Sequence, residues 1–368
     1  MTSLTAIDHE ASTTTDVEHT ELDDDTTNPS NPTRKVLYLT TPGSRVANQR
    51  GRFVVTDRNG GKLLDVPEAL VGTIVCNGAI NITSGAVEHL LEHDIHTVFL
   101  THRGRYLGAL RSRESSDAVR LRAQVTACSD PTFATQIATS IVAGKITNMR
   151  ALLMRFSRDH RHPDVDVTLD RLAKLADRVH DSMSTNEAMG VEGAATADYF
   201  SCWPHLLPEW TGFTHRRRRP PPDPVNAMLG FGGTLLSSFM TGAIAAARLE
   251  PTIGVLHADV PRRPSLALDL VEEFRPLVVD QVVLELARKN SVTPDHFEPG
   301  GEPDAVWMTD KGRRIFLDAF EQRLNQTFHY APLNRTVTYR RAMFLQAQQF
   351  SLAVRRGEPH YEPVRWRT

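Results

Sequence analysis

The residues best suited to chemistry lie in the segment 254–277, GVLHADVPRRPSLALDLVEEFRPL, where His257 stands a short loop ahead of Asp269 and Glu272. Apolar residues recur at helical spacing from Leu266 to Phe274, which predicts a helix there. Asp269 and Glu272 would share one face of it, and two carboxylates that close repel unless a proton, an arginine or a metal ion neutralises them. Because Mg²⁺ and Mn²⁺ prefer carboxylate oxygen and Mn²⁺ also accepts imidazole, the pattern favours these ions over Ca²⁺.

A plainer interpretation of the same residues remains open. Asp269 and Glu272 would lie on a solvated edge of the helix, and Arg275 would make an ordinary i,i+3 ion pair with Glu272. His257, Asp269 and Glu272 by themselves fit both a metal site and this surface arrangement.

The elements that must position these residues divide into two parts. From Lys35 to Leu110 short β-type runs dominate, with an Asn59-Gly60 pair typical of a tight hairpin and a helix expected to begin near Thr83 or Ser84. Beyond Arg111 apolar stripes recur at helical spacing almost throughout. We therefore predict an α+β protein with a small amino-terminal β-rich domain at 34–110, a larger all-helical catalytic domain at 111–356 and a C-terminal tail at 357–368.

The charge is distributed unevenly. Residues 1–33 hold eight Asp or Glu and no Lys or Arg, so the rest of the chain is net basic although the whole carries −2. With few large apolar groups, this acidic tail cannot offset the entropy lost on ordering, and we expect it to be disordered. An acidic tail of this kind can compete with DNA for a basic body or simply aid solubility.

Cysteine use and hydropathy bear on the compartment. Cys76, Cys128 and Cys202 form neither a CxxC pair nor a disulfide framework, which favours a reducing, cytoplasmic location. No continuous run of about 18 apolar residues exists, and the start is acidic, unlike a signal peptide. Membrane insertion is not expected.

Four stretches resemble a known family. LHADVPRRPSLALDLVEEFRPLV (256–278) resembles the signature of the CRISPR-associated integrase family, the metal-dependent nucleases at the core of spacer acquisition. Three others follow the same family in the same order: LVGTIVCNGAINITSGAVEHLLEHDIHTVFLTHRGRYLGAL (70–110), AMGVEGAATADYF (188–200) and RRRRPPPDPVNAMLGFGGTLL (216–236). The resemblance runs from about Arg34 to about Arg356, and LYLTTPG with LTHRGRYLGAL is most similar to the type I-C branch.

The resemblance implies a site and partners. Glu192, His257 and Glu272 would be ligands of Mg²⁺ or Mn²⁺, and Asp269 would be a fourth acidic member that binds directly or orients the others. The family acts on DNA as homodimers, which a dimer of the small second CRISPR adaptation protein bridges. The expected reaction is insertion of short DNA fragments into a repeat array by 3′-hydroxyl transesterification, and water as attacker would make the same site an endonuclease.

DNA binding requires positive charge near that site. Arg219, Arg262, Arg263 and Arg275 are the predicted contacts, because a planar guanidinium can bind two phosphate oxygens at once. Such contacts predict binding that is sensitive to salt and largely insensitive to sequence. The alternative for each arginine is a solvated loop.

Other functions are also open. A free-standing metal-dependent, structure-specific nuclease would use the same ligands without a partner, and a non-catalytic DNA-binding scaffold would keep only the arginines. His89-Leu90-Leu91-Glu92-His93 matches the H-x-x-E-H pattern of inverted zinc metalloproteases, although His89, Glu92, His93 and His96 are expected on the wet side of a short helix. No Walker loop, dinucleotide fingerprint or GxSxG motif occurs, which disfavours nucleotide-driven motors and serine hydrolases.

Overall fold

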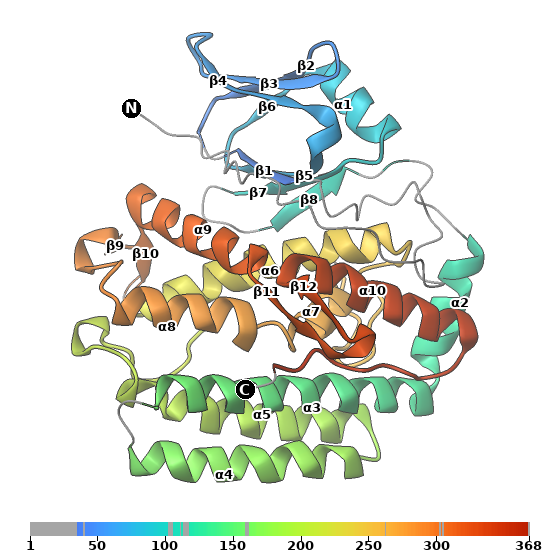
Figure 1. Cartoon of the computed structure of the whole chain (residues 1–368), viewed down its shortest axis with the longest axis vertical. Coiled ribbons are helices and arrows are strands. Elements are labelled where there is room, and N and C mark those ends of the chain that lie inside the picture. Colours follow the sequence, from blue (N-terminus) through green and yellow to red (C-terminus); the bar gives the residue numbers. More distant parts are fainter. Residues whose placement is uncertain are drawn as a thin grey trace. The chain divides into compact units, whose positions relative to one another are not determined.

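The computed structural model describes residues 35–39, 41–101, 106–110, 112, 118–158, 162–261, 263–301, 303 and 305–366. The chain divides into two compact units after Ala118, a little beyond Leu110, where the sequence placed the boundary. The first unit contains most of the strands and the second most of the helices (Figure 1). The expectation of a β-rich region followed by a helical domain is confirmed. The predictions for the acidic tail and for Arg262 lie outside the described residues.

The first unit contains two four-stranded sheets. One has the order β1-β5-β7-β8, with β8 antiparallel to β7 and the other pairs parallel; its strands are β1 (Lys35–Leu39), β5 (Val71–Asn77), β7 (His96–Leu100) and β8 (Tyr106–Leu110). The other has the order β4-β3-β2-β6; its strands are β2 (Arg45–Asn48), β3 (Arg52–Thr56), β4 (Lys62–Pro67) and β6 (Asn81–Ile82). The chain passes between the sheets through η1 (Glu68–Leu70), which joins β4 to β5, and through α1 (Ser84–Glu92), which joins β6 to β7.

Local sequence explains two of these connections. Between β3 and β4 the Asp57 carboxylate accepts hydrogen bonds from the amides of Asn59 and Gly61, and Gly60 takes a φ of +84°, as the predicted tight hairpin requires. Thr83 caps α1 by accepting a hydrogen bond from the Ala86 amide, so the predicted helix start is confirmed.

Both sheets contribute to one apolar core. In β3 alternate residues are buried, which gives Phe53 and Val55 to the core. They belong to the same buried cluster as residues of the other sheet, including Leu39 and Ile74. Leu90 of α1 closes this cluster, so the helix is held by the packing of its apolar side.

The second unit is mainly helical. Its helices are α2 (Ala118–Ser129, which begins at the boundary), α3 (Pro131–Phe156), α4 (Pro163–Arg178), α5 (Thr185–Ser201), α6 (Pro224–Ala246), α7 (Ser265–Val271), α8 (Gln281–Arg288), α9 (Asp310–Asn325) and α10 (Tyr339–Arg356). Short helical turns η3 (Val179–Asp181), η4 (Trp203–His205), η5 (Glu209–Thr211), η6 (Pro276–Asp280), η7 (Pro294–His296) and η8 (Ala331–Leu333) join them. Two short antiparallel pairs lie among the helices: β9 (Phe297–Pro299) with β10 (Val306–Met308), and β11 (Thr327–Tyr330) with β12 (Arg335–Thr338).

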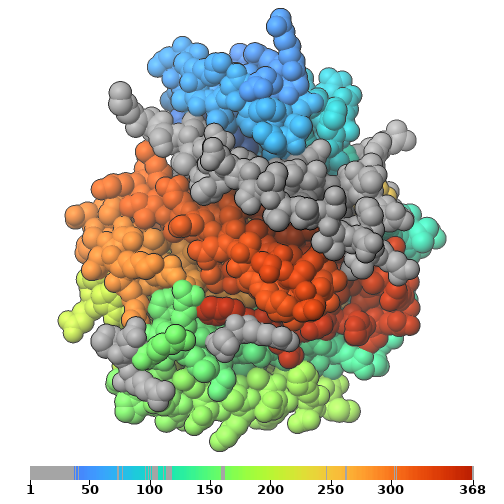
Figure 2. Space-filling model, viewed as in Figure 1, coloured from blue at the N-terminus to red at the C-terminus, as the bar shows by residue number. Residues whose placement is uncertain are grey.

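The long helix α3 organises this unit. It packs against α4 and α5, and its buried residues extend along most of its length (Figure 1). After α10 the chain returns to α3, where the Asn148 amide group donates hydrogen bonds to the carbonyls of Glu273 and Val364. On the face in Figure 2, the C-terminal third of the chain (orange to red) lies next to the green helices.

Helix α6 is the most apolar element. Its window Pro224–Ala245 has a mean hydropathy of 1.3, long and apolar enough for a membrane span, but 78% of the window is buried inside the protein. The sequence search for an unbroken apolar run missed it because Asn226 and several Gly, Ser and Thr interrupt the pattern. Its burial identifies it as the core helix of this unit.

The predicted helix after Pro264 is shorter than expected. α7 ends at Val271, a turn follows over residues 272–275, and the π-helical turn η6 leads into α8. Pro276 cannot donate an amide hydrogen bond to the preceding turn, which accounts for the interruption. Glu272 therefore lies at the C-terminal end of α7, with its amide still bonded to the Asp269 carbonyl.

Candidate functional site

Two predicted acidic residues converge on one buried lysine. Glu192 lies on α5 and Glu272 at the end of α7, and the Nζ of Lys145 on α3 donates a hydrogen bond to each carboxylate. The side chains of Lys145 and Glu272 are each only 5% exposed, whereas that of Glu192 is 22% exposed. The cluster is therefore closed on one side and open to solvent at Glu192.

Electrostatics hold this cluster in its charged form. Burial alone would raise the pKa of Glu272, but the positive charges of Lys145 and Arg275, with the hydrogen bond from Lys145, lower it to about 2. Burial alone would lower the pKa of Lys145, but the charges of Glu272 and Glu192 raise it above its ordinary value. The surroundings thus keep an anion at Glu272 and a cation at Lys145.

Further contacts fix the carboxylate oxygens. The Thr196 hydroxyl, one turn after Glu192 on α5, donates a 2.8 Å hydrogen bond to Glu192 Oε1. Arg275 Nε lies 3.1 Å from Glu272 Oε1. Next to Glu192 in the chain, Gly193 and Ala194 are exposed, so a ligand can approach the backbone of α5 at this point.

Asp269 holds the loop that carries His257. Its Oδ2 accepts hydrogen bonds from the amides of Val255 and Leu256 at 2.7 and 3.0 Å. Its Oδ1 accepts one from the His257 amide at 3.0 Å and another from His257 Nδ1 at 2.7 Å. Asp269 is fully buried and accepts four hydrogen bonds, so it orients His257.

The orientation of His257 follows from that bond. Every group that contacts the Asp269 carboxylate donates to it, so His257 Nδ1 carries the proton and Nε2 keeps a free lone pair when the ring is neutral. Asp269 lies on α7 three residues before Glu272, so its bond to His257 brings the imidazole near the acidic cluster. The structure thus brings Glu192, Glu272 and His257 to one region of the helical unit.

The interpretation that Asp269 and Glu272 lie on a solvated edge of the helix is wrong, because neither residue is exposed. Both Asp269 and Glu272 are buried, although the predicted ion pair between Glu272 and Arg275 is present. The two carboxylates also do not face each other, because Asp269 bonds the loop at 255–257 while Glu272 bonds Lys145. Their expected repulsion is relieved by separate partners.

In the structure, the donor atoms of the predicted metal ligands Glu192, His257 and Glu272 do not surround a single point. Within the described ranges, the groups whose donor atoms all lie within 4.8 Å of one another are Glu68, His89 and His93, and His162, Asp164 and His205. Glu192, His257 and Glu272 do not form such a group: the two glutamates share the Lys145 ammonium, whereas His257 Nδ1 bonds Asp269.

Sequence reasoning missed Lys145. It lies inside α3, in the stretch SIVAGKITN, among residues that are nearly all apolar or small. A lysine on the buried side of a long core helix requires a compensating acid, because an unpaired buried charge is very costly. The sequence therefore indicated that Lys145 needs an acidic partner, but a single sequence does not show which Asp or Glu that partner is.

The predicted arginines occupy different environments. Arg219 is exposed in the Pro-rich loop and Arg263 is partly exposed before α7, so both are accessible to a phosphate. Arg275 is committed to Glu272 and lies against α6 near Gly233, so its main role is inside the cluster. Burial, together with the nearby charges of Arg275 and Arg218, lowers the pKa of Arg216 to about 10.

The two histidines of the H-x-x-E-H motif meet an acid from another element. His89 and His93 meet Glu68 of η1, from outside the motif, while Glu92 of the motif is exposed. The expectation that His89 lies on the wet side of α1 is wrong, because its side chain is 18% exposed and packs edge-on against Phe53.

Comparison with known proteins gives a consistent result. The family model described as CRISPR associated protein Cas1 matches residues 37–322. A CRISPR-associated endonuclease Cas1 of Rhodospirillum rubrum is 32% identical over 344 residues, covering 90% of this chain and 98% of that protein. Another, from Thermus thermophilus, is 33% identical over 329 residues, covering 89% and 98%.

Solved structures share the fold. A chain of a Cas6-RT-Cas1–Cas2 complex is 26% identical with a TM-score of 0.78; the match covers 90% of this chain and 36% of that longer one. A Cas1 protein from Thermotoga maritima (24% identity, TM-score 0.75) matches over 91% of this chain and 100% of its own. A casposase bound to integration product (22%, TM-score 0.76) matches over 89% and 92%. By its family match and by its relatives over nearly its whole length, the chain belongs to the CRISPR-associated Cas1 family.

Proposed function

We propose that this protein inserts short DNA fragments into a CRISPR repeat array by metal-dependent transesterification. The single observation that carries the proposal is the convergence of Glu192 and Glu272, from separate helices, on one buried cation position beside an imidazole oriented by Asp269. Membership of the Cas1 family supports the choice of DNA and of the CRISPR array as substrates.

The donor chemistry of this cluster fits Mg²⁺ or Mn²⁺. Glu192 and Glu272 would supply carboxylate oxygen and His257 would supply Nε2, while Asp269 keeps the imidazole in the required tautomer. The Lys145 ammonium already shows that the two carboxylates accept a shared cation. When bound, the metal would stabilise negative charge on the attacked phosphate and favour ionisation of the attacking hydroxyl.

The reaction balances without a nucleotide cofactor. The 3′ oxygen of the incoming DNA end loses its proton and forms a bond to phosphorus in the repeat. The bond from that phosphorus to the repeat's own 3′ oxygen breaks, and this oxygen takes up a proton. One phosphodiester replaces another, and water in place of the attacking hydroxyl would give the endonuclease reaction.

Charged residues around the cluster position the DNA. Lys145 keeps Glu192 and Glu272 together and offsets their charge, and Arg275 restrains the Glu272 carboxylate. Arg219, Arg262 and Arg263 would contact phosphates rather than bases. Binding should therefore weaken as salt rises, with little dependence on sequence from these contacts.

Assembly, location and subtype belong to the same proposal. Structural similarity to a chain of a Cas6-RT-Cas1–Cas2 complex supports a second adaptation protein, Cas2, as partner. We place the homodimer contact in the β-rich unit and the protein in the cytoplasm, the latter supported by three free cysteines. The type I-C branch stays a prediction from the sequence.

The test is strand transfer of a labelled short duplex into a supercoiled plasmid bearing the repeat, with Mg²⁺ or Mn²⁺ and with or without the partner. Glu192→Ala and His257→Ala are compared with wild type. Matched controls are Glu187→Gln, an exposed acid on the same α5, and His180→Ala, an exposed histidine in η3.

We expect joined product that requires metal and partner, is lost in Glu192→Ala and His257→Ala, and persists in both controls. Nicking without joining, if lost in the same variants, would instead identify a free-standing nuclease. DNA binding without any metal-dependent product would identify a scaffold and overturn the proposal.

A further inference from the structure

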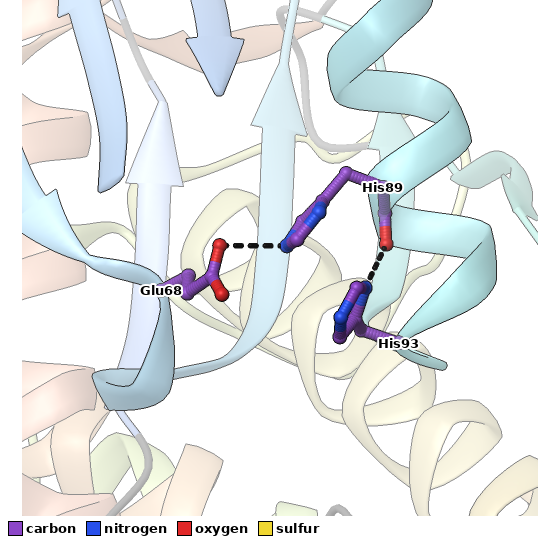
Figure 3. A group of neighbouring side chains, drawn as sticks. All are labelled: Glu68, His89 and His93. Atoms are coloured by element: carbon purple, nitrogen blue, oxygen red, sulfur yellow. Dashed lines mark hydrogen bonds and ion pairs between the residues drawn. The ribbon is translucent and has the colours of Figure 1, made fainter. Parts of the chain in front are cut away.

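A group of metal-ligand side chains in the first unit is unrelated to the Glu192 cluster. Glu68 of η1 and His89 and His93 of α1 place one donor atom each within 4.8 Å of one another, and they point toward one another between the two elements (Figure 3). We propose that these residues bind a divalent transition-metal ion of the zinc type, which links two of the connections between the sheets of this unit, η1 and α1.

The ligand types and their spacing suit zinc. His89 and His93 stand at i and i+4 on α1 and therefore share a face, and their rings stack with centroids 3.9 Å apart. Two imidazoles and a carboxylate are a common donor set for Zn²⁺, with water in the fourth position. Ligands of a tetrahedral Zn²⁺ at about 2.0–2.1 Å lie roughly 3.3 Å apart, so the three donor atoms, now within 4.8 Å of one another, must move closer and the two rings must turn out of their stack to face one ion.

A hydrogen bond holds His93 in the tautomer that can bind a metal. His93 Nδ1 lies 3.0 Å from the His89 carbonyl oxygen, which can only accept, so Nδ1 carries the proton (Figure 3). The Nε2 of a neutral His93 is then left as a ligand. A histidine that donates its other N–H to a backbone carbonyl is the usual arrangement around protein-bound zinc.

The other two ligands are also pre-positioned. His89 Nε2 lies 2.7 Å from Glu68 Oε2, yet this shielded nitrogen makes no hydrogen bond of acceptable geometry in the structure. Asn48 Nδ2 donates a 2.9 Å hydrogen bond to the same Glu68 oxygen, and Phe53 meets the His89 ring edge-on. The two atoms are thus held side by side, and a cation that moved them slightly apart could bind both.

The position of the group in the fold gives the metal a role. Glu68 lies in η1, which carries the chain from β4 to β5, and both histidines lie in α1, which carries it from β6 to β7. Each of these connections joins one sheet to the other. A metal ion held by both would link the two crossings and stabilise the two-sheet unit, much as a structural zinc stabilises a small domain.

A second group, His162, Asp164 and His205, is a weaker candidate and serves as the control. His162 Nδ1 accepts a hydrogen bond from the Asp164 amide at the start of α4, so that nitrogen is engaged in capping. The two rings stack with centroids 3.7 Å apart, and the side chains of His162 and Asp164 are 43% and 69% exposed. Because Nδ1 accepts a hydrogen bond, Nε2 of a neutral His162 carries the proton and has no lone pair for a metal.

The experiment measures Zn²⁺ binding to the full chain after removal of metal with a chelator, in a Glu192→Ala background that removes a proposed Mg²⁺ ligand. Zn²⁺ alone is titrated against a chromophoric chelator, and Co²⁺ absorption reports imidazole ligation. The variants are Glu68→Gln, which keeps an acceptor for Asn48, and His93→Gln, at an exposed ligand, with His205→Gln as matched control.

We expect one Zn²⁺ per chain, bound at least about tenfold more weakly in Glu68→Gln and His93→Gln and unchanged in His205→Gln. Zn²⁺ should also raise Tm by about 5 °C and slow hydrogen exchange in η1 and α1 but not in α3, and both effects should vanish in the two ligand variants. Circular dichroism checks that each variant is folded. Unchanged affinity in both ligand variants, or loss only in His205→Gln, would overturn the proposal.

Discussion

Glu272 and Glu273 are neighbours in the chain and both are buried, yet their pKa values move in opposite directions. Burial raises the pKa of Glu273 to about 7, although hydrogen bonds from Tyr361, Gln346 and the Val364 amide act to lower it. At Glu272 the same effect of burial is outweighed by Lys145 and Arg275, and the pKa is about 2. At this pair of residues, hydrogen bonds alone do not offset the effect of burial on Glu273, whereas the neighbouring cations do so at Glu272.

The region around Glu273 is structural. Its Oε2 accepts a 2.6 Å hydrogen bond from the Val364 amide, and its Oε1 accepts from Gln346 Nε2 at 2.9 Å and from the Tyr361 hydroxyl. These bonds fasten the segment after α10, residues 357–366, to the helical core. One glutamate of the pair thus faces the proposed site and the other holds the C-terminal segment.

The largest expected difference between the two glutamates is in activity. Glu272→Gln should reduce strand transfer by at least about 10²-fold, because a neutral amide is a poor metal ligand and cannot offset Lys145. Glu273→Gln keeps the size of the side chain and should change the rate by less than about threefold, since it has no contact with the cluster. Single-turnover joining assays on both variants measure this, and equal losses would contradict a separate role for Glu273.

The second prediction removes the cation itself. Lys145→Met leaves the buried carboxylate of Glu272 facing the partly exposed one of Glu192, and we expect the metal-free protein to lose about 3 kcal/mol of unfolding free energy. If Glu192 and Glu272 can hold a metal, Mn²⁺ should restore much of that loss and should stabilise the variant more than it stabilises wild type.

Urea denaturation with and without Mn²⁺ provides the measurement, and Lys174→Met, at an exposed position on α4, is the matched control. The control should lose little stability and respond to Mn²⁺ as wild type does. Destabilisation of Lys145→Met that Mn²⁺ leaves unchanged would contradict a metal site at these carboxylates.

The third prediction concerns pH. The pKa of Glu273 is about 7 when folded against an ordinary 4.5, so between these values the folded protein keeps a proton that the unfolded chain has lost. Stability from this group is therefore complete below about pH 4.5 and is lost as pH rises through 7, by up to about 3 kcal/mol. Glu272 acts in a separate window, since its lowered pKa gives stability above pH 4.5 that is lost as pH falls toward 2.

Glu273→Gln has no proton to lose and isolates the first of these windows. The difference in unfolding free energy between wild type and this variant should shift toward the variant from pH 5 to pH 8, as measured by urea denaturation at closely spaced pH values. Asp280, whose pKa burial raises to about 6, contributes equally to both proteins and cancels. Parallel pH profiles for the two proteins would contradict the assignment.

Much of the fold could be predicted from local patterns. The Asn59-Gly60 hairpin and the Thr83 cap of α1 depend on neighbours in sequence, and both were found. The short pairs β9–β10 and β11–β12 and the end of α7 at Val271 were not, since short strands have little periodicity and Pro276 acts only in its packed context. α6 illustrates the same limit, because its burial is a property of the whole unit.

The site was predictable in its residue types but not in its contacts. His257, Asp269 and Glu272 are close in sequence, and a resemblance added Glu192 from a distant helix. No pattern revealed that Asp269 bonds three backbone amides while Glu272 meets Lys145, 127 positions earlier in the chain. Long-range pairing of charges depends on how helices pack, which a single sequence does not encode locally.

The smallest expected effect tests how tightly the C-terminal segment is held. A Cβ added at Gly144, the residue before Lys145 on α3, would lie 2.5 Å from Pro363 Cβ and 3.7 Å from Glu273 Oε2. Gly144→Ala should cost about 1–2 kcal/mol, because overpacking at Pro363 outweighs the better helix propensity of alanine. Gly190→Ala on α5, where nothing lies within 4 Å of the added atom, should instead stabilise by up to about 1 kcal/mol.

The two glycine variants also separate the two regions in function. If the C-terminal segment only supports the fold, Gly144→Ala should speed limited proteolysis after α10 while strand transfer per folded molecule stays within about twofold of wild type. A much larger loss of joining, with the segment still protected from protease, would show that displacement at Gly144 reaches Lys145. The regions around Glu273 and Glu272 would then be coupled in function. The two residues would still differ in the direction of their pKa shifts, but not in their effect on joining.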